Sequence, residues 1–386
     1  MNTTKLAYKR VVLKFGTSLL TGGKEHLDLG IMSSLASQVA GILSLGAEVV
    51  IVTSGAVAAG KHKLKDNREL NSVPLKQVLA AVGQARLMQV YEELFEKHNI
   101  VVAQALLTKS DLSERTGYLN ARNTFTNLLE LGIVSIVNEN DVVAVDEIKD
   151  AKFGDNDNLS AMVANLVDAD LLLILSDIQG LFTADPNSCH SAELIREVDN
   201  IDSTIEKMAG GSASKLGTGG MSTKISAARL ATASGVNVII TDGKQTDIIT
   251  RIMRGEAIGT RFIPSATKLE SRERWMLSGL SSHGHLTIDK GAAESLLTHY
   301  KSLLPAGVTD THGNWQRGEL IDIYADGKHI GSGIANYCSE DIQSIKGRHS
   351  TEITQILGYS YGAELIHRNN MTLLNHRRPN VAGQTI

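Results

Sequence analysis

The possible folds of this chain are limited first by a series of short, continuously apolar segments that alternate with segments of helical periodicity. Such short apolar runs are typical of strands buried on both faces, which occur in parallel sheets covered by helices on both sides. The expected strands lie at residues 10–18, 47–56, 100–108, 133–141, 170–177 and 236–243. The expected helices lie at residues 31–45, 74–97, 120–131, 154–167, 192–209, 225–233 and 247–254. We therefore predict an α/β domain with a mostly parallel sheet.

Unusual residues gather where several of these strands end. The relevant stretches are Gly16-Thr-Ser, Thr53-Ser-Gly-Ala, Asn138-Glu-Asn-Asp and Ser176-Asp. In folds of this class, ligands bind beyond the carboxyl ends of the parallel strands. The four strand ends therefore predict one shared site rather than four unrelated loops.

A glycine-rich stretch, Lys215-Leu-Gly-Thr-Gly-Gly-Met-Ser-Thr-Lys224, leads directly into the expected helix 225–233. A glycine-rich loop before a helix offers free backbone N–H groups and the positive end of the helix dipole to a phosphate. No Gly-Lys-Ser/Thr sequence closes the stretch, so it is not a Walker A motif. An ordinary loop with a serine N-cap would give the same residues, and this stretch alone leaves both interpretations open.

Charged side chains at the other strand ends favour phosphoryl chemistry. Lys14 at the end of the first strand and Lys224 would together neutralise charge on a transferring phosphoryl group, with Asp157 orienting both lysines. Asn156 would hold a polar group of the substrate, and Asp141 would pair with a substrate ammonium. The structural alternatives are a solvated Lys14, an N-cap at Asp155 or Asn156 and a loop cap at Asp141.

The expected catalytic region offers no evident nucleophile with a general base. An alcohol acceptor would need such a base. A carboxylate, with a pKa near ~4, is already ionised at pH 7 and needs positioning and cations instead. The sequence therefore favours a carboxylate acceptor and an acyl-phosphate product.

Composition sets the domain count and the compartment. The chain has 386 residues and a net charge of −4, which argues against a protein that coats nucleic acid or membranes. Its two cysteines, Cys189 and Cys338, have no metal or disulfide spacing, and no signal peptide is evident, so we expect a cytoplasmic protein. We predict a catalytic domain over residues 1–264, a linker over 265–281, a small β-rich domain over 282–360 and a C-terminal extension over 361–386.

The β-rich domain is expected from alternating apolar and polar residues and from the hairpin signal Ala325-Asp-Gly-Lys. From residue 282 onward, nine Lys or Arg stand against ten Asp or Glu. This balance is poor for binding a phosphate backbone, so we do not expect this domain to bind RNA.

The motifs together resemble the glutamate 5-kinases of the amino acid kinase superfamily, from about residue 10 to residue 368. They are Val12-Leu-Lys-Phe-Gly-Thr-Ser, Val52-Thr-Ser-Gly-Ala, Val137-Asn-Glu-Asn-Asp, Phe153-Gly-Asp-Asn-Asp-Asn-Leu-Ser-Ala, Gly180-Leu-Phe-Thr-Ala-Asp-Pro and Gly217-Thr-Gly-Gly-Met-Ser-Thr-Lys. The resemblance implies a three-layer α/β/α sandwich with a C-terminal PUA domain. It also implies ATP-dependent phosphorylation of the γ-carboxylate of L-glutamate to L-glutamyl 5-phosphate, the first step of proline biosynthesis.

The same resemblance implies roles for individual residues. Lys14 and Lys224 would contact the phosphates, with Asp157 as the third catalytic residue, and Ser54, Asp141 and Asn156 would bind glutamate. The expected nucleotide site is lined by Lys14, Ser176, Asp177, Thr218, Gly219, Gly220, Met221, Ser222, Thr223 and Lys224. No dedicated protein ligands for a metal are implied.

The resemblance also implies partners. They are ATP as substrate, Mg²⁺ on its phosphates, proline as feedback inhibitor, a homo-oligomer (dimer or tetramer) and functional coupling to glutamate-5-semialdehyde dehydrogenase. Aspartate kinases, N-acetylglutamate kinases and UMP kinases share the fold and are the nearest alternatives. Aspartate kinases typically have the pattern Lys-Phe-Gly-Gly-Thr-Ser after the first strand, whereas this chain has Lys14-Phe-Gly-Thr-Ser, with one glycine fewer. The substrate of an N-acetylglutamate kinase has no ammonium group, so it would leave Asp141 without a partner.

Overall fold

The computed structural model describes residues 5–65, 72–144, 156–186, 188–210, 220–265 and 282–374. The chain divides into two compact units. The first unit contains residues 5–114 and 121–265 of the described chain, and the second contains residues 282–374 together with residues 115–120. Residues 266–281 of the expected linker (265–281) and the end of the chain (375–386) lie outside the described residues, so the domain boundaries there remain predictions.

An eight-stranded sheet organises the first unit, in the order β3-β4-β2-β1-β5-β7-β8-β6. Neighbouring strands run parallel except β7 and β8, so the prediction of a mostly parallel sheet is confirmed. The strands are β1 (Arg10–Phe15), β2 (Glu48–Thr53), β3 (Val102–Leu107), β4 (Val134–Glu139), β5 (Leu171–Ser176), β6 (Glu197–Val198), β7 (Asn237–Asp242) and β8 (Thr260–Phe262).

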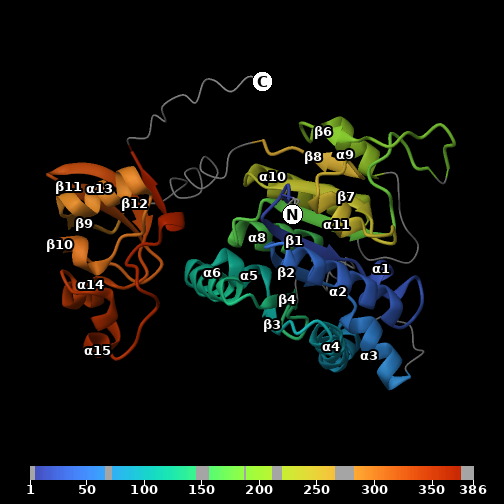
Figure 1. The fold of residues 1–386 in the computed structure, drawn as a ribbon, viewed down its shortest axis with the longest axis horizontal. Helices are drawn as coiled ribbons and strands as arrows, with labels where there is room; N and C mark the ends of the chain where they lie inside the picture. The colour runs from blue at the N-terminus through green and yellow to red at the C-terminus, as the bar shows by residue number, and fades with distance from the viewer. Residues whose placement is uncertain are drawn as a thin grey trace. The chain divides into compact units, whose positions relative to one another are not determined.

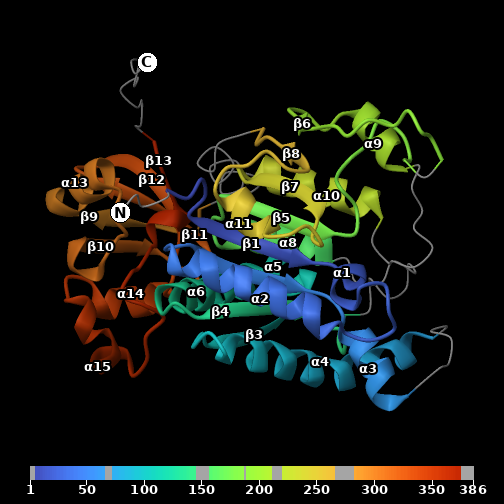
Figure 2. The same cartoon turned by 45° about the vertical axis from the view of Figure 1, so that its right-hand side comes forward.

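Helices cover both faces of this sheet (Figure 1). They are α1 (Thr17–Thr21), α2 (Leu29–Ser44), α3 (Ala56–Leu64), α4 (Val73–Glu96), α5 (Lys109–Ser113), α6 (Arg115–Glu130), α8 (Asn156–Leu166), α9 (Ser203–Gly210), α10 (Met221–Ala233) and α11 (Ile248–Met253). Figure 2 shows α2 in front of β1 and α8 behind it.

The alternation of side chains along β1 decides which residue faces which layer. Val11, Leu13 and Phe15 lie in the core that the sheet shares with α2, α4 and α11. Successive side chains of a strand point to opposite faces, so Lys14 faces the layer that contains α8. A lysine within an apolar strand thus reaches the carboxyl end of the sheet from inside the fold.

Local signals explain where the main helices begin. The Asp28 side chain accepts hydrogen bonds from the backbone N–H groups of Gly30 and Ile31, at 3.0 and 3.2 Å, and starts α2. Ser72 caps α4 through the N–H of Leu75, and Pro74 occupies its first turn, as expected from the sequence.

The crossing of α3 and α4 depends on two glycines. A Cβ atom on Gly83 would lie 1.7 Å from the carbonyl oxygen of Ala56, and one on Gly60 would lie 1.9 Å from the carbonyl oxygen of Leu79. Only glycine allows the two helix backbones to approach so closely. This contact fixes α4 beside the start of α3, immediately after the turn at the end of β2.

The prediction of a helix over residues 192–209 is wrong for its first half. Leu194 forms an antiparallel bridge with Phe182, and β6 pairs with β8 at the edge of the sheet. The helix begins only at Ser203, where the Asp202 side chain accepts from the N–H groups of Thr204 and Ile205. Pairing and burial at the sheet edge override the local helical spacing of these residues.

The second unit contains a five-stranded sheet in the order β10-β9-β11-β12-β13. Its elements are β9 (Gly284–Ile288), α13 (Lys290–His299), β10 (Val308–Gly313), β11 (Leu320–Ala325), β12 (Lys328–Ile334), α14 (Ser339–Ile345), α15 (Ile353–Leu357) and β13 (Met371–Leu373). The hairpin between β11 and β12 turns at Asp326 and Gly327, both with positive φ. The buried Leu365 and Ile366 and the strand β13 extend this unit past residue 360, the end that we expected for the β-rich domain.

Candidate active site

A buried cluster of two lysines and one carboxylate lies at the carboxyl end of the first sheet. Lys14 is the residue before the last of β1, Asp157 lies in the first turn of α8, and Lys224 lies in the first turn of α10. The Lys14 Nζ is 2.7 Å from Asp157 Oδ1, and the Lys224 Nζ is 3.5 Å from Asp157 Oδ2. The exposed fractions of Lys14, Asp157 and Lys224 are only 6%, 2% and 5%, respectively. The structure therefore brings together three residues that the sequence assigned to catalysis.

Asp157 makes further contacts that hold it in place. Thr223 Oγ1 donates to Asp157 Oδ2 at 2.7 Å, and Ser160 Oγ donates to the Asp157 backbone carbonyl at 2.6 Å. Burial opposes ionisation of this carboxyl, but Lys14 and Lys224 outweigh it, and its pKa falls from 3.8 to about 2. Asp157 is thus a fixed anion at neutral pH, suited to orienting the lysines and unsuited to taking up a proton.

The charge of Lys224 depends on this carboxylate. Burial lowers the pKa of Lys224, Asp157 raises it again, and the nearby Lys14 charge lowers it, with a net fall from the ordinary value. The cluster holds two cations and one anion, so it carries excess positive charge in a region that water reaches poorly. Such an arrangement attracts a polyanion.

The N-terminus of α10 points its backbone N–H groups at the same region. Gly220 is its N-cap in an extended conformation, and no side chain of the described residues caps it. Met221 and Lys224 are buried, Thr223 is half-buried and Ser222 is exposed. An uncapped helix N-terminus beside two lysines is a seat for phosphate. Thr218 and Gly219, which the sequence also assigned to this seat, lie outside the described residues.

A group of amides and a hydroxyl adjoins the cluster. Asn156, the residue before Asp157, donates through Nδ2 to Ser54 Oγ at 3.0 Å and to Asn138 Oδ1 at 3.2 Å. Asn138 in turn donates through Nδ2 to Gln84 Oε1 at 2.8 Å. The sequence assigned Ser54 and Asn156 to the substrate, and the structure joins them directly. It adds Asn138, which the sequence marked only as part of a polar strand end, and Gln84, for which the sequence gave no signal.

The remaining predicted residues lie at neighbouring strand ends. Asp141 follows β4, and its backbone carbonyl accepts from Gln77 Nε2 at 3.3 Å. Ser176 ends β5 and donates through Oγ to Asp177 Oδ1 at 3.0 Å, with Ser176 buried and Asp177 exposed. The backbone N–H of Gly16 donates to the Leu175 carbonyl at 3.3 Å, which holds the ends of β1 and β5 together.

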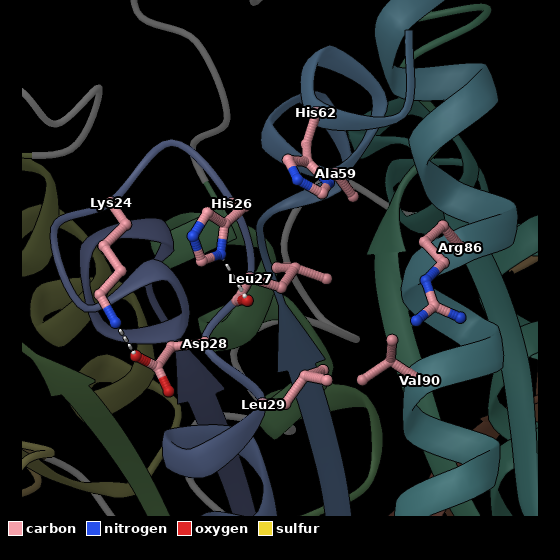
Figure 3. A pocket seen from close by; sticks show the side chains of 9 residues that line it. All are labelled: Lys24, His26, Leu27, Asp28, Leu29, Ala59, His62, Arg86 and Val90. Atoms are coloured by element: carbon pink, nitrogen blue, oxygen red, sulfur yellow. Dashed lines mark hydrogen bonds and ion pairs between the residues drawn. The ribbon is translucent and has the colours of Figure 1, made fainter. Parts of the chain in front are cut away.

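A pocket of about 360 Å³ opens elsewhere on the first unit (Figure 3). Lys24, His26, His62 and Arg86 are its basic lining residues, and none of them belongs to the predicted site. Lys24 is paired with Asp28 at 2.8 Å, and Arg86 lies 3.5 Å from Glu93. Lys24 and Arg86 therefore each have a carboxylate partner of their own, whereas Lys14 and Lys224 share one carboxylate.

The fold and the geometry of this site are typical of a class: α/β proteins that bind phosphate-bearing ligands at the carboxyl ends of parallel strands. Comparisons with known proteins give the family. The sequence pattern of the amino acid kinase family matches residues 9–242, and that of the PUA domain matches residues 284–357. The chain belongs to the amino acid kinase family, and its second unit contains a PUA domain.

Individual relatives match almost the whole chain. A glutamate 5-kinase of Dehalococcoides mccartyi (strain ATCC BAA-2266 / KCTC 15142 / 195) is 56% identical over 368 residues, which cover 95% of this chain and 99% of the relative. The glutamate 5-kinase of Herpetosiphon aurantiacus is 48% identical over 365 residues, covering 94% and 98%. A solved UMP kinase from Bacillus anthracis aligns at 17% identity with a TM-score of 0.47, covering 67% of this chain and 97% of that one.

None of the helices in the described part of the chain combines the length and apolar character needed to cross a bilayer.

Proposed function

We propose that this chain transfers the γ-phosphoryl group of ATP to the γ-carboxylate of L-glutamate and forms L-glutamyl 5-phosphate, the first step of proline biosynthesis. The observation that carries the proposal is the buried Lys14–Asp157–Lys224 cluster beside the N-terminus of α10. Relatives named glutamate 5-kinase, which match nearly the full chain, support the choice of substrate.

In the proposed reaction, an oxygen of the γ-carboxylate attacks the γ-phosphorus in line. The bond from that phosphorus to the bridging oxygen of ADP breaks, and ADP leaves with the electron pair. No proton has to be removed from the acceptor, because a carboxylate is ionised at neutral pH. Lys14, Lys224 and the N–H groups of α10 stabilise the charge on the equatorial phosphoryl oxygens. Asp157 keeps the two lysines in place.

The two substrates would occupy opposite sides of this cluster. Ser54, Asn156 and Asp141 would bind glutamate, with Asp141 pairing with its ammonium group. Ser176, Asp177 and the segment 218–224 would bind ATP. The contact between Asn156 and Ser54 supports the first group, and the position of α10 beside Asp157 supports the second.

Mg²⁺ would reach the site on the ATP phosphates and neutralise part of their charge. Asp157 is engaged by two lysines and by Thr223, so it is a poor candidate ligand. Among the residues that the structure describes, no group of three or more His, Cys, Asp or Glu is arranged to hold a metal ion. We propose that phosphate oxygens of ATP and water supply most of its ligands.

The family resemblance supports four further proposals. Proline acts as a feedback inhibitor, the chain assembles as a dimer or tetramer, and its product is passed to glutamate-5-semialdehyde dehydrogenase. The protein works in the cytoplasm.

A single experiment tests reaction class and substrate together. The purified chain is incubated with ATP, Mg²⁺ and hydroxylamine, together with glutamate, aspartate or N-acetylglutamate in separate reactions, and the acyl phosphate is trapped as hydroxamate. We expect hydroxamate with glutamate and at least about tenfold less with the other two. N-acetylglutamate leaves the charge of Asp141 unpaired, which typically costs more than ~1.4 kcal/mol. Aspartate is one methylene shorter, so its side-chain carboxylate would lie out of line with the phosphorus. Hydroxamate with N-acetylglutamate alone would contradict the role of Asp141, and absence of product with all three would contradict a carboxylate kinase.

A further inference from the structure

We infer that Gln84 is a positioning residue of the amino-acid site, acting through Asn138 to fix the orientation of Asn156. This inference rests on the proposed function, because it concerns how the same site holds its carboxylate substrate. Gln84 lies on α4, and neither its helix nor its sequence context marked it as part of the site.

Three side-chain amides and one hydroxyl form a continuous chain of hydrogen bonds. It runs from Gln84 on α4 through Asn138 at the end of β4 to Asn156 at the start of α8, and ends at Ser54 after β2. Asn138 lies on the same face of β4 as Val134 and Ile136, and these two residues belong to the core that the sheet shares with α4. The chain of hydrogen bonds therefore passes around the carboxyl edge of the sheet, from the α4 layer to the α8 layer.

The direction of these bonds determines which atom of Asn156 is left for a ligand. Its Nδ2 group has two hydrogens, and both are used, one for Ser54 Oγ and one for Asn138 Oδ1. Its carbonyl Oδ1 is buried and has no hydrogen-bond partner among the residues that the structure describes, and the residue is only 4% exposed. A buried acceptor without a partner is costly, so its position indicates a donor supplied by a ligand. The ammonium group of an amino acid is such a donor.

Gln84 is the acceptor at the first step of this chain of hydrogen bonds. It accepts the Nδ2 hydrogen of Asn138, so Asn138 must turn its carbonyl towards Asn156. Asn156 then has to present Nδ2 to Asn138 and Oδ1 to the substrate. The Nε2 atom of Gln84 is buried without a partner in the described part of the chain, so Gln84 contributes to the chain of hydrogen bonds through its carbonyl.

The packing of α4 holds Gln84 in place. Its neighbour Gly83 lies in the close crossing with α3, where a Cβ would overlap the Ala56 carbonyl. Further along α4, the Tyr91 hydroxyl lies 2.7 Å from Thr53 Oγ1, at the end of β2. Both contacts tie α4 to the strand end that carries Ser54, so Gln84 has little freedom to leave Asn138.

The test compares Gln84→Met with Gln89→Met. Methionine keeps the length of glutamine but cannot accept the hydrogen of Asn138, and Gln89 is an exposed glutamine on the same helix. In the hydroxamate assay, Gln84→Met is expected to raise KM for glutamate about threefold to tenfold, the loss of one hydrogen bond. KM for ATP and kcat should stay within about twofold, and Gln89→Met should match the wild type in all three constants.

Two further variants separate positioning from a merely structural effect. If Gln84 acts only through Asn156, adding Gln84→Met to Asn156→Ala changes KM for glutamate no further, whereas independent effects would multiply. Asn138→Ala breaks the same link from its other side and should raise KM for glutamate at least as much as Gln84→Met does, which keeps the test available if Gln84→Met does not fold.

The outcomes distinguish this inference from the proposed function. A wild-type chain that forms no hydroxamate with glutamate overturns both. An active wild type with an unchanged KM for glutamate in Gln84→Met, or with multiplying effects in the double variant, overturns the role of Gln84 alone.

Discussion

Replacing Asp157 by asparagine removes the negative charge that both Lys14 and Lys224 contact and keeps the size and shape of the side chain. The two ammonium groups then lie buried beside a neutral amide. Because removing one member of a buried ion pair leaves the other charge uncompensated, the substitution should destabilise the first unit strongly.

The expected loss can be worked out from the pKa of Asp157, which falls from 3.8 to about 2 on folding. A shift of this size corresponds to roughly 2–3 kcal/mol in the free energy of unfolding. Because the pKa of Asp157 is lower in the folded state, this stabilisation is complete at pH values well above 3.8, the pKa in the unfolded chain. It is lost as the pH falls through about 2, the pKa in the folded chain. About half of it should remain near pH 3.

Urea unfolding at pH 7, 5 and 3 measures this effect. We expect Asp157→Asn to be less stable than the wild type by about 2–4 kcal/mol at pH 7 and pH 5, with a clearly smaller difference at pH 3. Asp199→Asn, at an exposed position, is the matched control and should change the stability by less than ~0.5 kcal/mol. A difference that is negligible at pH 7, or that does not shrink at pH 3, would refute the assignment of Asp157 as a buried anion between two lysines.

Three other substitutions test the rest of the structure. Lys224→Ala should lower kcat about 100-fold or more in the hydroxamate assay, since one preorganised donor is worth ~3 kcal/mol; a near-normal kcat would remove Lys224 from the phosphate site. Asp141→Asn should mainly raise KM for glutamate, and an effect on KM for ATP alone would mean that the two substrate sites are reversed. Gly83→Ala places a Cβ 1.7 Å from the Ala56 carbonyl and should cost ~1–3 kcal/mol in urea unfolding. Gly41→Ala, whose Cβ meets nothing within 4 Å, should be neutral or stabilising by ~0.5–1 kcal/mol, and equal losses in both variants would contradict the crossing.

Much of the first unit could be predicted from local sequence because its strands are apolar without interruption. A short, continuously apolar strand is stable in the middle of a sheet that helices cover on both faces. The strands β1, β2, β4 and β5 are buried in this way. The residues that follow such runs must lie at one edge of a parallel sheet. For this reason the sequence alone suffices to assign Lys14, Ser54 and Ser176 to one region.

Segments with mixed patterns could not be assigned in this way. Residues 192–198 have helical spacing, yet β6 forms there because β8 offers an open strand to pair with. The partner strand lies more than sixty residues further along the chain, and local propensity contains no information about it. The fifth strand of the second sheet, Met371–Leu373, was missed for the same reason, since only its pairing with β12 makes it a strand.

The sequence by itself determined the chemistry that gathers at the edge of the first sheet: two lysines, a carboxylate, amides and a glycine-rich helix start. Tertiary structure alone decided the bonds among them. Asp157 became the shared partner of Lys14 and Lys224 because β1, α8 and α10 meet at the same place. Gln84 joined Asn138 because two glycines let α4 approach α3. Hydrogen bonds and ion pairs act over about 3 Å, and only the packed fold brings such distant residues within that range.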